Sequence, residues 1–204
     1  MISIDIKDPD LIELLEELNN WFDSTDKSLF RFKGEPDHEN YYTSEEYFET
    51  INQEVHIGYP EVSYVVDYND MESTPLEWRD KIVGFSRKFK NILSSPAFAA
   101  NLYYPSGGYM GWHNNHNASG YNILLSYTKN GDGFFRYKDP KTLQTITIED
   151  KPGWTAKVGY YGNRDEKDKI YWHCARAYED RLTLGFIIPN ESMWKMMIDD
   201  IQAK

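Results

Sequence analysis

Two stretches near the start of the chain carry apolar residues at the three- and four-residue spacing of an amphipathic helix. In residues 8–22, Asp8 is a candidate helix cap and Pro9 suits the first helical position. In residues 74–93, Thr74 and Glu77 have the spacing of a capping box around Pro75. The apolar faces are Leu11, Leu14, Leu15, Leu18 and Phe22 in the first stretch, and Ile82, Phe85, Phe89, Ile92 and Leu93 in the second. Both stretches are predicted to be helices that cover a sheet.

After residue 96 the pattern changes to short segments that alternate or are largely apolar, as strands do. Turn sequences such as "PSGG", "NGDG" and "KPG" separate them. The segments are 98–105, 108–113, 121–128, 133–139, 143–149, 154–161, 170–173 and 181–188. Eight such strands predict a mainly β fold with flanking α-helices: a double-stranded β-helix, or jelly roll, with the amino-terminal helices packed on one sheet.

The predicted organisation is a single domain over residues 1–204. Residues 1–96 form its helical part, 97–189 the jelly-roll core and 190–204 a closing helix. Inside the helical part, residues 34–73 are rich in tyrosine and acidic side chains. That insert is interpreted either as an irregular surface segment with a short strand near 62–68, or as a mobile lid whose aromatic rings close over a substrate.

Composition narrows the classes of partner. Aromatic residues make up 16 % of the chain, and 33 acidic against 22 basic side chains give a formal charge of −11. A folded globule is expected, and nucleic acid is disfavoured as a partner because its binders rely on basic surfaces. A small molecule or a peptide with some positive charge is favoured. The single cysteine, the lack of an apolar run of about 20 residues and the lack of a secretory signal favour a cytoplasmic protein.

The apolar strand 181–188 carries an arginine where a central strand faces the interior. Alternation places Arg181 and Thr183 on one face of this strand. A guanidinium that points into a barrel needs an anion, and its planar fork matches a carboxylate. That anion is either a ligand or a structural aspartate or glutamate, and the sequence leaves both open.

Two histidines stand at the predicted ends of strands. His113 lies in "GYMGWHNNHNASG", and His173 follows 60 residues later in "IYWHCARAY". From a strand end, residues i and i+2 project to the same side, so Asn115 could add an oxygen to these two imidazoles. Two imidazoles and one oxygen on one face of an octahedral ion are the facial arrangement of non-haem iron(II) oxygenases.

These residues resemble the iron(II)/2-oxoglutarate-dependent oxygenase superfamily, whose pattern is His-x-Asp/Glu, a distal His and then an Arg or Lys. The matching positions are His113, Asn115, His173 and Arg181. "NLYYPSGG" is similar to the Asn-x-Tyr segment of the dealkylase branch. "GWHNNHNASG" and "GFFRYKDP" most resemble small uncharacterised oxygenase-like proteins of bacteriophages, which would place this chain in a host cytoplasm. The resemblance covers 101–188, a little under half of the chain.

The resemblance implies a dioxygenase that uses Fe(II) as metal and 2-oxoglutarate as cosubstrate, most often to hydroxylate a substrate. The metal ligands implied are His113, Asn115 and His173; the cosubstrate contacts implied are Arg181, Thr183, Asn101 and Tyr103. Candidate pocket residues are Tyr109, Trp112, His116, Phe135 and Trp172. His116 is otherwise expected in a surface loop, His38 and His56 on the surface, and Cys174 in packing away from the metal.

The family's carboxylate ligand is missing, because Asn115 stands in its place. Asn115 could still ligate the metal, with 2-oxoglutarate supplying further affinity. An open position there would resemble the halogenating branch of the family. The third alternative is a catalytically altered or inactive jelly-roll module that binds a ligand or serves only as structure.

Overall fold

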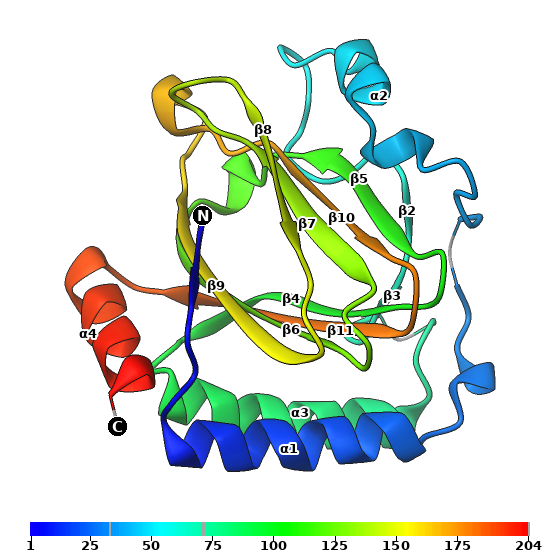
Figure 1. Ribbon diagram of the computed structural model, residues 1–204, viewed down its shortest axis with the longest axis vertical. Helices are drawn as coiled ribbons and strands as arrows, with labels where there is room; N and C mark the ends of the chain where they lie inside the picture. Colours follow the sequence, from blue (N-terminus) through cyan, green and yellow to red (C-terminus); the bar gives the residue numbers. More distant parts are fainter. Residues whose placement is uncertain (33, 71, 204) are drawn as a thin grey trace.

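The computed structural model describes residues 1–32, 34–70 and 72–203 and consists of two antiparallel β-sheets that face each other, with helices on the outside (Figure 1). The strands are β1 (Ile2–Ile4), β2 (Ser63–Tyr64), β3 (Val66–Asp67), β4 (Ala97–Tyr104), β5 (Tyr109–His113), β6 (Gly120–Thr128), β7 (Gly133–Lys138), β8 (Thr145–Glu149), β9 (Gly153–Tyr161), β10 (His173–Ala177) and β11 (Arg181–Ile188). The α-helices are α1 (Pro9–Ser24), α2 (Glu45–Thr50), α3 (Leu76–Ile92) and α4 (Glu191–Gln202). Short 3₁₀ turns occur at Lys27–Leu29, Tyr41–Thr43, His116–Ala118 and Lys167–Lys169.

The chain crosses between the two sheets along the core strands. One sheet has six strands in the order β1-β9-β6-β11-β4-β3, and the other has five in the order β2-β5-β10-β7-β8. From β4 to β7 and from β8 to β11, each strand lies in the sheet opposite its predecessor, which is the winding of a double-stranded β-helix. The predicted jelly roll is therefore confirmed. One predicted strand is wrong. A strand was expected over residues 170–173, ending at His173, whereas β10 begins at His173.

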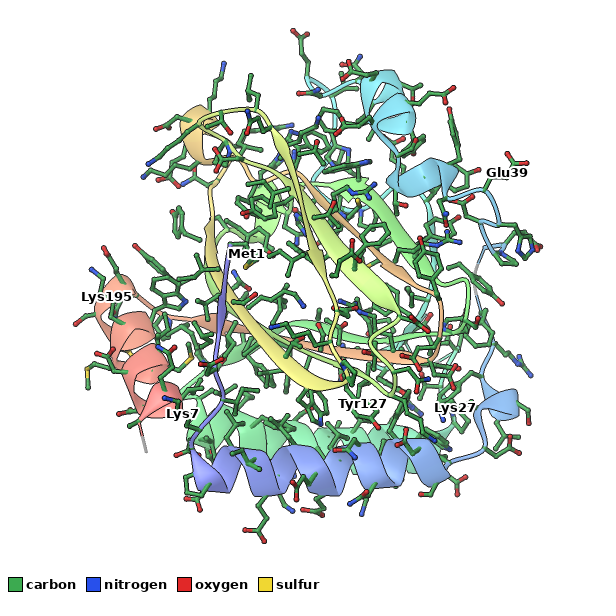
Figure 2. The ribbon with its side chains drawn as sticks, in the orientation of Figure 1. Met1, Lys7, Lys27, Glu39, Tyr127 and Lys195 are labelled. Atoms are coloured by element: carbon green, nitrogen blue, oxygen red, sulfur yellow. The ribbon has the colours of Figure 1, made fainter. Side chains whose placement is uncertain are left out.

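Helices α1 and α3 cover the outer face of the six-stranded sheet, as predicted (Figure 1). Alternation along β11 sends Leu182, Leu184 and Phe186 to this face, where they join the apolar stripes of both helices. Each large apolar side chain buried here contributes about 1.5–3 kcal/mol relative to exposure. At the end of α1, Tyr127 lies between sheet and helix and donates from its hydroxyl to Asp23 Oδ2 over 2.6 Å (Figure 2).

The two long helices begin differently. The carboxylate of Asp8 accepts from the Leu11 N–H over 2.7 Å, so the predicted cap of α1 is confirmed. The capping box predicted for α3 is not formed. Pro75 occupies the cap position, and the Thr74 hydroxyl donates instead to the Asp67 carbonyl at the end of β3.

The insert 34–73 covers the outer face of the five-stranded sheet in the described part. It holds α2 as well as strands β2 and β3, which lie within the stretch where one strand was predicted. Phe48 of α2 packs edge-on against Trp112 of β5 and against Trp172. The Trp112 indole donates to the Ser44 carbonyl over 2.8 Å. These contacts give the aromatic residues of the insert a packing role, while its role as a lid stays a prediction.

Helix α4 closes the chain against the six-stranded sheet, where its Met197 and Ile201 join the apolar core. Among the described residues, no helix combines the length and apolar character needed to cross a bilayer.

Candidate active site

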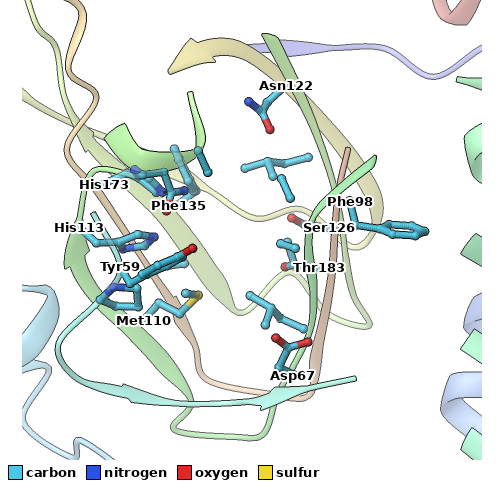
Figure 3. Close-up of a pocket in the computed structure, with 18 of the residues that line it drawn as sticks. Tyr59, Asp67, Phe98, Met110, His113, Asn122, Ser126, Phe135, His173 and Thr183 are labelled. Atoms are coloured by element: carbon cyan, nitrogen blue, oxygen red, sulfur yellow. Dashed lines mark hydrogen bonds between the residues drawn. The ribbon is translucent and has the colours of Figure 1, made fainter. Parts of the chain in front are cut away.

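A pocket of about 240 Å³ lies between the two sheets and receives side chains from both (Figure 3). His113 and His173 come from the five-stranded sheet, and Thr183 and Ser126 face them from the six-stranded sheet. Leu102, Leu124 and Met110 make much of the wall apolar. The pocket thus presents imidazole groups on one wall and hydroxyl and guanidinium groups on the other.

The two histidines meet because β5 and β10 are neighbours in the five-stranded sheet. His113 is the direct cross-strand partner of His173, and their ring centroids are 4.0 Å apart. Both side chains are buried, with 4 % and 5 % of their surface exposed. Sequence reasoning placed the two imidazoles together, and the structure brings them into contact.

A bulge in β5 turns His113 toward the pocket. The register runs from His173 opposite His113 to Ala175 opposite Met110, so three steps along β5 match two along β10. The extra residue places both Met110 and His113 at the pocket, where strict alternation would place them on opposite faces. Gly111 lies in the bulge, and a larger residue would not fit there, because a Cβ would lie 2.8 Å from the Val62 side chain.

Backbone carbonyls fix the orientation of both imidazoles. His113 Nδ1 lies 2.8 Å from the Gly111 carbonyl oxygen, and His173 Nδ1 lies 2.8 Å from the Tyr171 carbonyl oxygen. Because a carbonyl only accepts, each Nδ1 must carry the proton, which leaves a lone pair on each Nε2. This is the arrangement that surrounds metal-binding histidines.

Burial keeps both imidazoles neutral. It lowers the pKa of His173 to about 4, and it lowers the pKa of His113 well below the usual value, with a further contribution from the neighbouring His173 ring. A neutral imidazole is the form that binds a metal ion.

Asn115 lies at the same end of the pocket. Its amide nitrogen is 3.3 Å from His173 Nε2 and donates to the lone pair there. The residue has a left-handed backbone with φ of 52°, a conformation that asparagine tolerates better than most residues. Its N–H donates to the Gly58 carbonyl over 2.8 Å, which ties this residue to the insert. Asn115 is therefore held beside the imidazoles by its backbone.

At the other wall, the predicted inward orientation of Arg181 and Thr183 is confirmed. Arg181 is 1 % exposed, and its Nη1 donates to the Thr183 hydroxyl over 2.7 Å. Its Nε donates to Asp150 Oδ2 over 2.7 Å and its Nη2 donates to the Ser126 hydroxyl over 3.2 Å. Of the two anions left open by the sequence, the structural carboxylate is present.

A second cation binds the same carboxylate. Lys157 of β9 donates to Asp150 Oδ1 and to the Thr155 hydroxyl, both over 3.2 Å. Burial would raise the pKa of Asp150, but Arg181 and Lys157 outweigh that effect and hold the pKa below its usual value. Burial lowers the pKa of Lys157, although Asp150 opposes this. Two cations against one anion leave this cluster with one unit of positive charge inside the fold.

Asn101 and Tyr103 do not reach the pocket. Their cross-strand partners are Leu184 and Leu182, which face the helices, and directly opposed residues share a face. The Tyr103 hydroxyl donates to Asp180 over 2.8 Å among the rings beneath α1. The expectation that both would contact a cosubstrate is therefore wrong by one residue of register. Tyr104 faces the pocket instead, with its ring 5.0 Å from the Arg181 guanidinium carbon.

Of the other candidate pocket residues, Phe135 is placed at the pocket, with its ring stacked 5.5 Å from that of His173. Tyr109, Trp112 and Trp172 pack on the outer face of the five-stranded sheet, so their assignment to the pocket is wrong. The β5 bulge explains Trp112, because it turns His113 inward and its neighbour outward. His116 is not among the residues that line the pocket, and it begins a 3₁₀ turn at the partly exposed surface.

His38 is exposed and Cys174 is buried in the outer apolar cluster, as expected. His56 was expected on the surface, but it is 2 % exposed and packs against the Trp172 ring at 4.7 Å. Sequence reasoning also missed Asp150, Lys157 and Ser126. For Ser126 and Lys157 the signal is alternation: Ser126 is opposite Thr183, and Thr155, two residues before Lys157, is opposite Ser126.

Across residues 1–32, 34–70 and 72–203, no group of three or more histidine, cysteine, aspartate or glutamate side chains is arranged to hold a metal ion. A metal site here would consist of two imidazoles with an amide as the third donor.

Comparison with known proteins finds similarity in structure and not in sequence. No family model and no curated protein matches the sequence. Among solved structures, a prolyl hydroxylase from Trichoplax adhaerens, in complex with a hypoxia inducible factor oxygen degradation domain peptide fragment, is similar over 96 % of this chain and 86 % of its own, with 11 % identity and a TM-score of 0.49. A Pseudomonas putida prolyl-4-hydroxylase is similar over 88 % and 99 %, with 13 % identity and a TM-score of 0.37. YcfD, a ribosomal oxygenase from Escherichia coli, is similar over 72 % of this chain and 37 % of its own, with 17 % identity and a TM-score of 0.36.

Proposed function

We propose that this protein is a non-haem Fe(II)- and 2-oxoglutarate-dependent dioxygenase that hydroxylates a small-molecule or peptide substrate. One observation carries the proposal: two neutral imidazoles, each oriented by a backbone carbonyl so that its Nε2 carries a lone pair, share one pocket with a buried arginine and its hydroxyl neighbours. The proposed setting is the cytoplasm, where Fe(II) and the buried thiol of Cys174 stay reduced.

The donor set fits a divalent iron ion. His113 and His173 would bind through Nε2, because each Nδ1 is already committed to a carbonyl. Asn115 would supply its amide oxygen, since turning the side-chain amide exchanges nitrogen for oxygen at the same place. When bound, Fe(II) and 2-oxoglutarate would supply the oxidising power, by coupling reduction of dioxygen to decarboxylation of the cosubstrate.

The remaining residues would bind the cosubstrate and exclude water. Ser126 and Thr183 accept from Arg181, so each hydroxyl hydrogen remains to be donated to a carboxylate in the pocket. The positive charge of the Arg181 cluster favours an anion at this end. Leu102, Leu124 and Met110 would keep the space between the two ends dry, which strengthens each polar contact inside.

The test is an anaerobic titration of metal-free protein with Fe(II) and 2-oxoglutarate, followed through the metal-to-ligand charge-transfer absorption. A band in the wild type that is lost in His173→Ala is the expected result, with His38→Ala, a change of an exposed histidine, as the matched control. Absence of the band in the wild type at saturating Fe(II) and 2-oxoglutarate would contradict the proposal.

Two observations favour a second candidate, a jelly-roll module that binds an anion without oxidising it. Asp150 already occupies one edge of Arg181, and Asn115 replaces the usual carboxylate ligand. This candidate predicts that 2-oxoglutarate binds with the same affinity with and without Fe(II), whereas the dioxygenase predicts tighter binding with iron. Calorimetric titration under nitrogen separates the two.

A further inference from the structure

The buried cluster of Arg181, Asp150 and Lys157 determines the charge at one end of the pocket. Arg181 lines the pocket and pairs with Asp150, and Lys157 of β9 pairs with the other oxygen of the same carboxylate. Lys157 is 1 % exposed, as is the side chain of Asp150. A buried cation that serves only to balance a carboxylate is not needed here, because Arg181 alone neutralises Asp150.

The arrangement has a cost that a ligand could offset. Each buried ion loses its hydration, and an uncompensated charge is the costly case. With Arg181 and Asp150 paired, the charge of Lys157 has no counterpart within the cluster. An anion that enters the pocket beside Arg181 would supply this missing charge, because attraction acts over several ångströms where water is excluded.

We propose that Lys157 is a positioning residue that sets the charge of the ligand: by sharing Asp150, it leaves Arg181 with a net positive charge that selects a ligand with a terminal carboxylate. The assignment of that carboxylate to the cosubstrate rests on the proposed function. The selection itself depends only on the cluster, and so it also acts in metal-free protein.

The hydroxyl groups beside Arg181 give this selection a geometry. Ser126 and Thr183 each accept from the guanidinium, which fixes their oxygens and directs their hydrogens away from it. A carboxylate has two acceptor oxygens and can take both hydroxyl donors, whereas a methyl end group takes none. Loss of the Lys157 charge would leave these donors in place and remove only the electrostatic preference.

The experiment is a calorimetric titration of metal-free protein with 2-oxoglutarate and with 2-oxopentanoate, which has a methyl group in place of the terminal carboxylate. We expect wild-type protein to bind 2-oxoglutarate at least tenfold more tightly than 2-oxopentanoate. In Lys157→Met this ratio should fall by about tenfold, the effect of one charge several ångströms away at an effective dielectric constant of about 20. Lys157→Arg should keep the ratio, and so should Lys167→Met, a change of an exposed lysine.

Lys157→Gln replaces Lys157→Met if the methionine variant does not fold, because its amide keeps a donor for Asp150. An unchanged ratio in whichever of these variants is folded would overturn the inference, and so would equal binding of the two ligands by wild type. A normal preference without the iron-dependent absorption band would instead reject the proposed function and leave the role of Lys157 intact.

Discussion

The two ends of the pocket solve the problem of buried polar groups in opposite ways. At the histidine end, His113 and His173 are neutral, and backbone carbonyls satisfy their Nδ1 protons. At the arginine end, charge is retained, and Asp150 stabilises two cations in the same cluster. The histidine end presents Nε2 lone pairs to a ligand that accepts electrons, and the arginine end presents a positive charge to a ligand that is an anion. The pocket is therefore polarised before any ligand enters.

The comparison predicts that stability depends on the arginine end much more than on the histidine end. Asp150→Asn would leave Arg181 and Lys157 buried side by side without their anion. Breaking a buried ion pair in this way costs about 3–5 kcal/mol of unfolding free energy. Urea denaturation measures this cost, with Asp168→Asn, a change of an exposed aspartate, as control. A loss below about 1 kcal/mol would show that the cluster carries less charge than its contacts indicate.

Metal affinity should depend on the histidine end alone. His113→Ala removes one of the two oriented lone pairs, and even changes in the groups that orient such ligands cost 10- to 100-fold. We expect at least a 100-fold loss of Mn(II) affinity, which electron paramagnetic resonance of free Mn(II) measures. Thr183→Val, at the other end, should leave Mn(II) affinity within about twofold. Equal losses in the two variants would contradict the division of the pocket.

Asn115→Asp tests whether the amide, in place of a carboxylate, lowers the metal affinity of the proposed site. A carboxylate would add a negative charge beside His173 and should tighten Mn(II) binding by about tenfold, or 1.4 kcal/mol. Aspartate tolerates the left-handed backbone at this position, so the change is compatible with the fold. Asn117→Asp, at an exposed position two residues later, controls for charge at a distance. A gain of the same size in this control would attribute the effect to overall charge.

The smallest expected effect concerns a single hydroxyl. Thr183→Val keeps the side-chain shape but removes the acceptor for Arg181 Nη1. The loss of one such hydrogen bond should reduce the free energy of unfolding by about 1 kcal/mol. Thermal unfolding, with Thr142→Val at an exposed turn as the reference, measures it. No change would mean that Asp150 and Ser126 alone hold the guanidinium.

The sequence predicts the winding of the sheets and the presence of His113, His173 and Arg181 in one pocket because these depend on local periodicity and strand order. It fails where one residue of register decides the outcome. On β4 alternation correctly groups Asn101 with Tyr103, but the face they share is known only from their partners on β11. Asp150 follows the end of β8, where no periodic pattern indicates that it reaches Arg181. The burial of His56 also depends on packing between distant segments, here against Trp172.

The bulge in β5 has a consequence for how such a site changes over evolutionary time. Deletion of the Gly111 codon would remove the extra residue and restore regular pairing with β10, with Met110 opposite Ala175, Trp112 opposite Cys174 and His113 still opposite His173. The indole of Trp112 would therefore stay on the outer face with Cys174, and the imidazole of His113 would stay in the pocket with His173. In a lineage of such proteins, the length of this strand can thus change by one residue at the bulge without separating the two histidines.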